Sequence, residues 1–142
     1  MIIIDRFRGE YAFLSNFNTC FEHGKSVEHF YQASKAINSK DYLKIINADS
    51  PVDAKRLSKI IPIRKDWDNV KLIVMEELLK KKFTIPKLSS LLLSTNDALL
   101  VEGNNHGDTF WGVCDNVGSN NLGKLLMKIR DEFLSTEAMI EY

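Results

Sequence analysis

The apolar spacing of residues 66–83, DWDNVKLIVMEELLKKKF, constrains the fold more than any other feature of this chain. Apolar residues recur at helical intervals, at Trp67, Val70, Val74, Leu78 and Leu79. Because an α-helix repeats about every 3.6 residues, they form one stripe that must be buried. Three lysines, Lys80 to Lys82, follow at the C-terminal end, where the helix dipole favours cations, and we expect that end to be solvated.

Further helices are predicted on both sides of this one. NNLGKLLMKIRDEFL, residues 120–134, carries a second apolar stripe and should be a core helix; the stripe is Leu122, Leu125, Leu126, Ile129 and Phe133. Shorter helices are expected over 27–38, over about 40–48, from Pro51 to Pro62 with Ser50 as its cap, and from Pro86. Residues 2–4 and 98–102 predict short strands, and residues 7–17, FRGEYAFLSNF, a loop or irregular strand.

These elements predict an α+β fold that is mostly helical with a few short strands. At 142 residues and 44% hydrophobic content, the chain suffices for one core, and we expect residues 1–142 to form a single domain. Its 19 basic and 19 acidic residues give no net charge, so an anionic ligand must be held by a local cluster. We expect a cytoplasmic protein with no membrane partner, since no apolar run has the length of a signal or a span.

The segment SVEHFYQASKA, residues 26–36, predicts a helix with one polar and one apolar face. Ser26 is placed to cap it, and Glu28, Gln32 and Lys35 fall within about 60° of one another. Any amphipathic surface helix shows such a face, so periodicity alone leaves open whether it is a wet face or a site. We expect His29, at the edge between the faces, to be a structural hydrogen bonder.

The chain resembles the NADAR family, also called the YbiA-like proteins, in several blocks that occur in the family's order. The blocks are LSNF at 14–17, SVEHFYQASKA, AKRLSK at 54–59, RKDWDNVKLIVM at 64–75, LLLSTNDALLVEGNNHGDTFWG at 91–112 and GSNNLGKLLMKIRDEF at 118–133. The resemblance implies a single helical α+β domain without metal or cofactor. It also implies an N-glycosidase, acting on ADP-ribose attached to guanine in nucleic acid or on phosphoribosylated intermediates of riboflavin synthesis.

Two positions depart from the family pattern. Lys25 stands where relatives often have proline, which should alter only the entry into the helix. The loop GVCDNVGSNNLG carries Cys114, Asp115 and Asn116 where relatives vary. Substrate selectivity is therefore the property that transfers least directly.

The resemblance gives the polar helix face a catalytic reading. Breaking an N-glycosidic bond builds positive charge on the sugar, so a carboxylate is needed near C1, and Glu28 is the first candidate. Gln32 would hold a ribose hydroxyl. Lys35 would either orient the acid as a cation or, with a lowered pKa, attack a ring-opened C1 aldehyde; the alternative is a solvated surface lysine.

Asp108 and Trp111, in HGDTFWG, form a second group of candidates. Asp108 would accept a ribose hydroxyl or act as a second carboxylate, and Trp111 would either stack on a purine or pack in the core. Asn121, at the start of the last helix, either presents its amide beside an anion at the helix N-terminus or simply caps the helix.

The remaining candidates for substrate binding are Ser15, Asn16 and Arg64. Ser15 and Asn16 are polar within LSNF, where packing needs no polarity, whereas Phe13 and Phe17 are expected in the core. Arg64 is kept from the basic cluster that also includes Lys55, Arg56, Lys59 and Lys65, most of which we expect to be solvated.

Three other interpretations compete with an N-glycosidase. A cysteine nucleophile at Cys20 or Cys114 lacks any surrounding motif, and we expect both thiols to be reduced. A metal site from His106, Asp108 and Cys114 matches no common zinc spacing. The serious rival is a module that binds ADP-ribose or NAD without turning it over, although such a module has no use for Glu28 and Lys35. The leaving base, the carrier of the sugar and the oligomeric state stay open.

Overall fold

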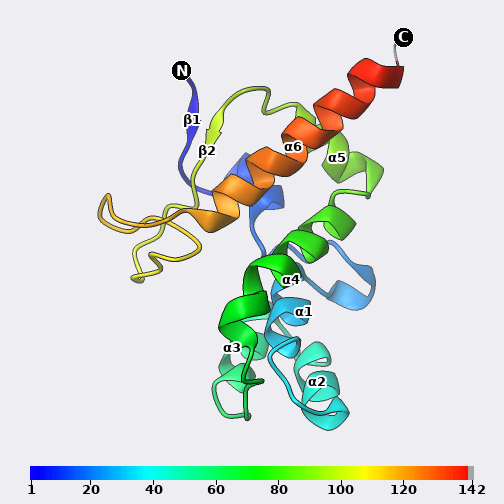
Figure 1. Ribbon diagram of the computed structural model, residues 1–142, viewed down its shortest axis with the longest axis vertical. Coiled ribbons are helices and arrows are strands. Elements are labelled where there is room, and N and C mark those ends of the chain that lie inside the picture. Colours follow the sequence, from blue (N-terminus) through cyan, green and yellow to red (C-terminus); the bar gives the residue numbers. More distant parts are fainter. Residues whose placement is uncertain (141–142) are drawn as a thin grey trace. The chain divides into compact units, whose positions relative to one another are not determined.

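The computed structural model describes residues 1–140, and the chain there is mostly helical with two short strands, which confirms the predicted α+β class (Figure 1). The strands are β1, Ile3–Ile4, and β2, Leu99–Leu100. The α-helices are α1 Val27–Ala33, α2 Ser39–Ile46, α3 Pro51–Ser58, α4 Trp67–Lys82, α5 Pro86–Leu93 and α6 Asn121–Ile140, and two 3-10 helices are η1 Gly9–Leu14 and η2 Glu22–Gly24. No helix in this range is long and apolar enough to cross a membrane.

The chain divides into two compact units. Residues 16–82 form one, which we call the central unit, and residues 1–15 together with the chain from Phe83 onward form the other, the terminal unit. The prediction that residues 1–142 make a single domain stays a prediction.

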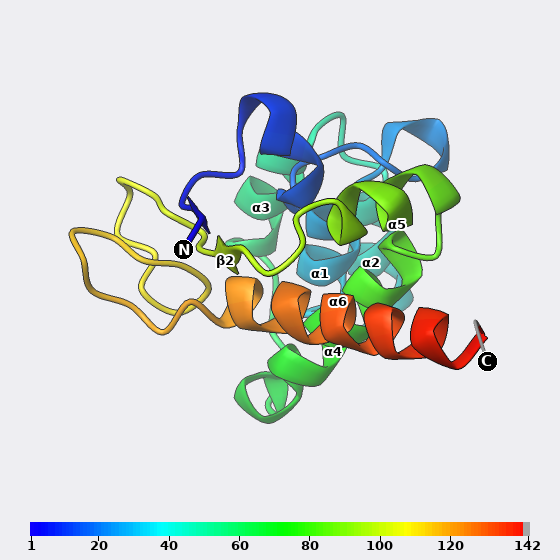
Figure 2. The same cartoon turned by 90° about the horizontal axis from the view of Figure 1, so that it is seen from above.

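The terminal unit is built around a parallel pair of strands and the last helix. β1 pairs with β2 in the register Ile3 to Leu99 and Ile4 to Leu100. α6 begins beside β2 and packs against it and against α5 (Figure 2). Leu122, Leu126 and Ile129 of α6 are buried, so the predicted apolar stripe is confirmed.

In the central unit α1 packs against α2, α3 and α4 (Figure 1). Small and branched side chains from the first three helices form a core cluster, namely Ala33, Ile45, Ala48 and Ala54. Each of these helices has a polar N-cap: Ser26, Asn38 and Ser50 accept hydrogen bonds from the backbone N–H three residues on. The predicted start of α3, with Ser50 as cap and Pro51 at its first position, is confirmed.

The first helix is shorter than predicted, ending at Ala33 and not at residue 38. The Ser34 hydroxyl donates to the Phe30 carbonyl, and the backbone tightens into bonds from Lys35 N to Gln32 O and from Ala36 N to Ala33 O. The Lys35 carbonyl then accepts from Arg64 N at 2.9 Å, a tertiary bond that replaces the next helical one. Lys35 therefore lies in a turn just beyond α1.

The segment FRGEYAFLSNF was wrongly predicted as a loop or irregular strand, since residues 9–14 form η1. The chain enters it through Gly9 at φ 59°, a conformation that glycine adopts readily, and Tyr11 N bonds to Arg8 O. Phe13 is in the core as expected, but Phe17 is 40% exposed, so its core assignment was wrong.

The prediction that the lysine run at the end of α4 is solvated is confirmed for Lys80 and Lys81 and wrong for Lys82. Lys82 is fully buried, because it falls on the same face as Met75 and Leu79, which are buried too. Burial lowers the pKa of Lys82 to about 8, and the nearby Cys20 partly opposes that shift.

Candidate active site

The entry to α1 is fixed by Ser26 and His29, which form a capping box. Ser26 N donates to His29 Nδ1 at 3.1 Å, and His29 Nε2 lies 3.1 Å from the Ala48 carbonyl. This pattern requires the neutral tautomer with its proton on Nε2, and burial lowers the pKa of His29, which keeps the ring neutral. The predicted structural role of His29 is confirmed.

Glu28 points its carboxylate into a buried polar environment in the first turn of α1. Its side chain is 6% exposed, and Gln32, one turn later and 4% exposed, donates from Nε2 to Glu28 Oε1 at 2.6 Å. Glu28 N donates to the carbonyl of Asn16 at 3.0 Å, which brings Asn16 to the same turn. A buried carboxylate with an oriented amide is a costly arrangement for a wet helix face, so the surface alternative for these residues does not fit.

Lys35 is half-buried with its ammonium in front of two aromatic rings. Its Nζ lies 5.6 Å from the centroid of Tyr31 and 5.9 Å from that of Trp67, and the two rings are themselves 5.1 Å apart. Both rings are buried, so they replace water on one side of the amine.

The pKa of Lys35 is lowered, first by this burial, while the charge of Glu28 opposes the shift. Three further lysines, Lys55, Lys59 and Lys71, add to the lowering because each positive charge disfavours another. Since Lys55 and Lys59 come from α3 and the turn after it and Lys71 from α4, the packing of the central unit creates this field. The sum favours a larger fraction of neutral amine than an ordinary surface lysine has.

Arg64 lies next to Lys35 because its backbone N–H donates to the Lys35 carbonyl. Its side chain, however, is already paired with Asp66. The guanidinium donates from Nε and from one terminal nitrogen to the two carboxylate oxygens of Asp66, at 2.6 and 2.8 Å. This pairing raises the pKa of Arg64 and lowers that of Asp66. A phosphate bound by Arg64 must therefore compete with Asp66.

Asp108, Trp111 and Asn121 come together in the terminal unit around the backbone of Phe110. Asp108 Oδ1 accepts from the N–H of Phe110 at 3.1 Å and of Trp111 at 2.9 Å, and Asn121 Nδ2 donates to the Phe110 carbonyl at 3.0 Å. Trp111 is half-buried and meets Phe110 edge to face, with centroids 4.8 Å apart. One oxygen of Asp108 and the amide of Asn121 thus hold the loop in shape. Their substrate roles stay predictions, as does that of half-buried Ser15, which follows η1.

The NADAR domain model matches residues 6–134, a range that spans nearly the whole chain. The chain belongs to the NADAR family.

Named relatives and a solved structure agree with this membership. The chain is 44% identical over 114 residues to N-glycosidase Npun_R5314 of Nostoc punctiforme, covering 75% of this chain and 72% of that protein. It is 38% identical over 109 residues to N-glycosidase YbiA of Escherichia coli, covering 74% and 68%. The NMR structure of the Escherichia coli protein YbiA superposes with a TM-score of 0.84 at 34% identity, over 96% of this chain and 88% of that one.

A third relative is a larger protein. The riboflavin biosynthesis protein PYRR, chloroplastic, of Zea mays is 40% identical over 125 residues, covering 78% of this chain and 20% of that protein.

Sequence reasoning missed two kinds of residue in this NADAR protein. Tyr31 and Trp67 flank the Lys35 amine. The sequence placed Trp67 only in a packing stripe, and nothing in that stripe indicated its contact with Lys35. Asn104 and Asn120 organise the loop and the start of α6: Asn104 Oδ1 accepts from Asp108 N, and Asn120 bonds the backbone on both sides of Val101. A signal for Asn120 was available, because Asn tolerates the positive φ of 52° found there.

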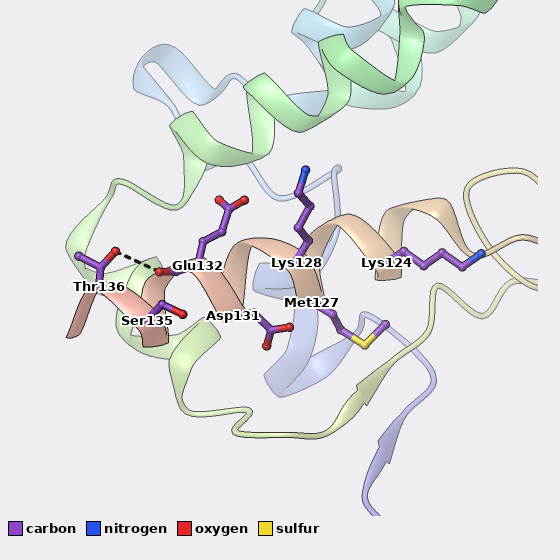
Figure 3. Close-up of a pocket in the computed structure, with 7 residues that line it drawn as sticks. All are labelled: Lys124, Met127, Lys128, Asp131, Glu132, Ser135 and Thr136. Atoms are coloured by element: carbon purple, nitrogen blue, oxygen red, sulfur yellow. Dashed lines mark hydrogen bonds between the residues drawn. The ribbon is translucent and has the colours of Figure 1, made fainter. Parts of the chain in front are cut away.

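A hollow along α6 has no link to the predicted site. It is lined by side chains between Lys124 and Thr136, where Thr136 donates to the Glu132 carbonyl at 3.0 Å (Figure 3). None of the predicted site residues lines it. Among the side chains of residues 1–136, no group of three His, Cys, Asp or Glu is placed to hold a metal ion.

The cysteine alternative also finds little support. Cys20 and Cys114 are free cysteines. Burial raises the pKa of the Cys20 thiol, and the Lys82 charge offsets only part of that shift. A thiol with a raised pKa is a poor nucleophile.

Proposed function

We propose that this protein is an N-glycosidase that hydrolyses the bond between ribose C1 and a nitrogen, with ADP-ribose attached to guanine in nucleic acid as its substrate. The observation that carries the proposal is the buried Glu28 carboxylate held by Gln32, close enough to the Lys35 amine to shift its pKa. Relatives in Nostoc punctiforme and Escherichia coli are both named N-glycosidase, and these names support the reaction class.

Glu28 has the properties needed beside the reacting carbon. When the C1–N bond breaks, the base takes the bonding electrons and the sugar becomes cationic, so a fixed negative charge stabilises the transition state. Gln32 holds the carboxylate in one orientation before the reaction, which reduces the reorganisation that the reaction requires.

Lys35 has two possible roles in this proposal. As a cation it would orient Glu28. As a neutral amine it would add to C1 of the ring-opened sugar, where guanine is attached as an imine; the C1–N bond to guanine then breaks, guanine leaves with the proton that the amine gives up, and water hydrolyses the Schiff base that remains on Lys35. The lowered pKa and the shielding by Tyr31 and Trp67 support the second role. Borohydride reduction during turnover would trap that Schiff base as a permanent mass increase on Lys35.

The proposal rests on the central unit. The roles expected for Ser15, Asp108, Trp111 and Asn121 in the terminal unit, and for Arg64, stay predictions. The cytoplasmic location and a nucleic-acid partner are likewise predictions from the sequence.

A second candidate substrate is a phosphoribosylated intermediate of riboflavin synthesis. The name of the PYRR relative favours it, although the chain matches only 20% of that protein. A module that binds ADP-ribose without reaction is disfavoured, because it gains nothing from a buried acid and a low-pKa amine.

The test is an assay of purified protein against both substrate classes, with mass detection of the freed base. We expect guanine release from an oligonucleotide that carries ADP-ribosylated guanine. Release only from the phosphoribosyl intermediates would transfer the proposal to the second candidate, and release from neither would refute the N-glycosidase assignment.

A further inference from the structure

Two buried amide oxygens in the central unit have no hydrogen-bond partner among the described residues. They are Gln32 Oε1 and Asn16 Oδ1, on side chains that are 4% and 7% exposed. A buried acceptor left unsatisfied keeps the cost of losing its water, so native proteins rarely retain one without a use. Both oxygens belong to residues that hydrogen-bond Glu28, Gln32 through its side chain and Asn16 through its backbone carbonyl, and this common neighbour points to donors supplied by a ligand.

The orientation of both amides follows from their neighbours. Gln32 turns its nitrogen to Glu28, since an ionised carboxylate can only accept, and this leaves the oxygen as the free atom. Asn16 turns its nitrogen to the sulfur of Met75 at 3.5 Å, and a thioether also can only accept. Both free atoms are therefore acceptors, which require an O–H or N–H donor.

Their position relative to Glu28 identifies the donor. Gln32 is bonded to the carboxylate that the proposed reaction places at C1, and the 2′-hydroxyl is on the adjacent carbon. Asn16 joins the same turn of α1 through its carbonyl, which accepts from Glu28 N. The vicinal hydroxyls of ribose supply two donors next to the reacting carbon, one for each acceptor.

We propose that Gln32 Oε1 and Asn16 Oδ1 accept hydrogen bonds from the 2′- and 3′-hydroxyls of the sugar, and so make the enzyme selective for ribosides over 2′-deoxyribosides. The inference rests on the proposed function and adds the sugar that the site requires. A substrate without the 2′-hydroxyl leaves Gln32 Oε1 buried and unpaired. Sites that hydrogen-bond a substrate hydroxyl discriminate strongly against analogues that lack it, and we expect a ratio of about a hundredfold or more.

The experiment compares matched substrates that differ only at the 2′ position. Guanine in an oligonucleotide carries either ADP-ribose or its counterpart with a 2′-deoxyribose at the attachment, and kcat/KM is measured for both, each relative to its uncatalysed rate. The two free ligands are compared as well: ADP-ribose, and the analogue whose terminal ribose, the one that would be attached to guanine, lacks the 2′-hydroxyl. For each ligand the shift in the melting temperature of the protein is measured.

Three variants show which atoms produce the ratio. Gln32→Met and Asn16→Leu keep the approximate volume and remove an acceptor, so each should reduce the ratio about tenfold or more. Met75→Leu removes the sulfur partner of Asn16 but leaves its oxygen, and the ratio should stay at the wild-type value. A merely structural role for Gln32 or Asn16 would lower kcat/KM for both substrates and leave the ratio unchanged.

The outcomes separate this inference from the proposed function. Guanine release from both substrates at equal relative rates would overturn the inference. Buried water, and not the sugar, would then donate to Gln32 Oε1 and Asn16 Oδ1. The N-glycosidase assignment would stand. If neither substrate is cleaved, the proposed function fails. The melting shifts then decide: a larger shift with ADP-ribose than with its deoxy counterpart supports the ribose subsite, and equal or absent shifts overturn it.

Discussion

His29 couples the stability of the central unit to pH through one buried ring. Its Nδ1 accepts from Ser26 N, and this bond is possible only while the ring is neutral. Protonation would break this half of the capping box of α1, the helix that carries Glu28 and Gln32, and leave the bond from His29 N to Ser26 Oγ. The candidate site is therefore built on a helix whose capping box is complete only with a neutral histidine.

We predict that stability falls as the pH drops below the ordinary histidine pKa of about 6.5. Because burial lowers the pKa of folded His29, the unfolded chain binds the proton first, and acid shifts the equilibrium toward it. Urea unfolding at pH 7.5 and 5.5 measures the effect. His29→Asn should be less stable at pH 7.5 and lack this part of the acid dependence, and an identical dependence in both proteins would contradict the prediction.

Lys82 yields a prediction of the same sign in the alkaline range. With a pKa of about 8 in the folded state, Lys82 binds fewer protons than in the unfolded chain between about pH 8 and 10.5, so stability rises with pH there. Lys82→Met should raise the free energy of unfolding at pH 7 by about 1–3 kcal/mol and abolish that rise. Chemical unfolding at pH 7.5 and 9.5 measures both, with exposed Lys81→Met as the matched control. An equal rise in wild type and Lys82→Met would refute this account.

At the residue scale, local chemistry was predictable and burial was not. Ser26, Ser50 and the structural role of His29 follow from chain-local hydrogen bonding, which the sequence displays directly. The burial of Lys82 depends on what packs over the end of α4, and a lysine run gives no sign of that. Asp66 stands two residues after Arg64 in the sequence, so an ion pair between them could be expected. Only the structure shows that the pair is bidentate and that a substrate phosphate must compete with Asp66 for Arg64.

Asn120 joins two elements of the terminal unit that are distant in the sequence. Its Oδ1 accepts from Glu102 N at 3.0 Å and its Nδ2 donates to the Leu100 carbonyl at 2.9 Å, so it connects β2 to the start of α6. Gly123 supports this junction, because a Cβ there would collide with the Leu100 carbonyl. The loop that contains Asp108 and Trp111 lies between these two elements in the sequence.

We predict that Asn120→Ala destabilises the protein by about 2–3 kcal/mol, since it removes two hydrogen bonds and places alanine at a positive φ. Asn120→Gly keeps the backbone unstrained and should lose about 1–2 kcal/mol, the share of the hydrogen bonds. Thermal unfolding of the two variants measures the difference. Stability equal to wild type in Asn120→Ala would show that the side chain does not connect these elements.

At the element scale, helices marked by an apolar stripe, as α4 and α6 are, or by a cap followed by proline, as α3 is, were predicted well. The end of α1 was not, because a tertiary bond from Arg64 N to the Lys35 carbonyl competes with continuation of the helix. η1 was missed because its aromatic residues fit several local structures. These failures share one cause: the deciding contact comes from elsewhere in the chain.

At the scale of the whole molecule, NADAR membership and the mostly helical fold followed from ordered blocks of sequence, which the family match and the YbiA structure confirm. The candidate site was predictable in part. Glu28, Gln32 and Lys35 were chosen from one helix face; in the structure Gln32 bonds the buried Glu28 carboxylate, the charge of Glu28 acts on Lys35, and the Asn16 carbonyl accepts from Glu28 N. Trp67 was not predictable as a partner of Lys35, because the turn after α1 and the start of α4 meet only on folding, whereas the spacing of four residues from Tyr31 to Lys35 was a local signal that was missed.

A ligand of the folded protein should stabilise it by mass action. We predict that ADP-ribose raises the melting temperature, with a stabilisation of about 2.7 kcal/mol when its concentration is a hundred times its Kd. Differential scanning fluorimetry with increasing ADP-ribose measures the shift, and adenosine diphosphate without the terminal ribose is the control. No shift at millimolar ADP-ribose would contradict both the hydrolase and the binding-module interpretations.

The most direct measurement is base release by Glu28→Gln and Lys35→Ala on oligonucleotides with ADP-ribosylated guanine and on phosphoribosyl intermediates. Both variants should keep the fold and lose at least about a hundredfold in kcat, since each removes a group that the proposed function assigns to the reacting carbon, while Lys40→Ala, at an exposed lysine of α2, keeps full activity. Wild-type rates of guanine and base release in both Glu28→Gln and Lys35→Ala would show that the reaction does not occur at this helix.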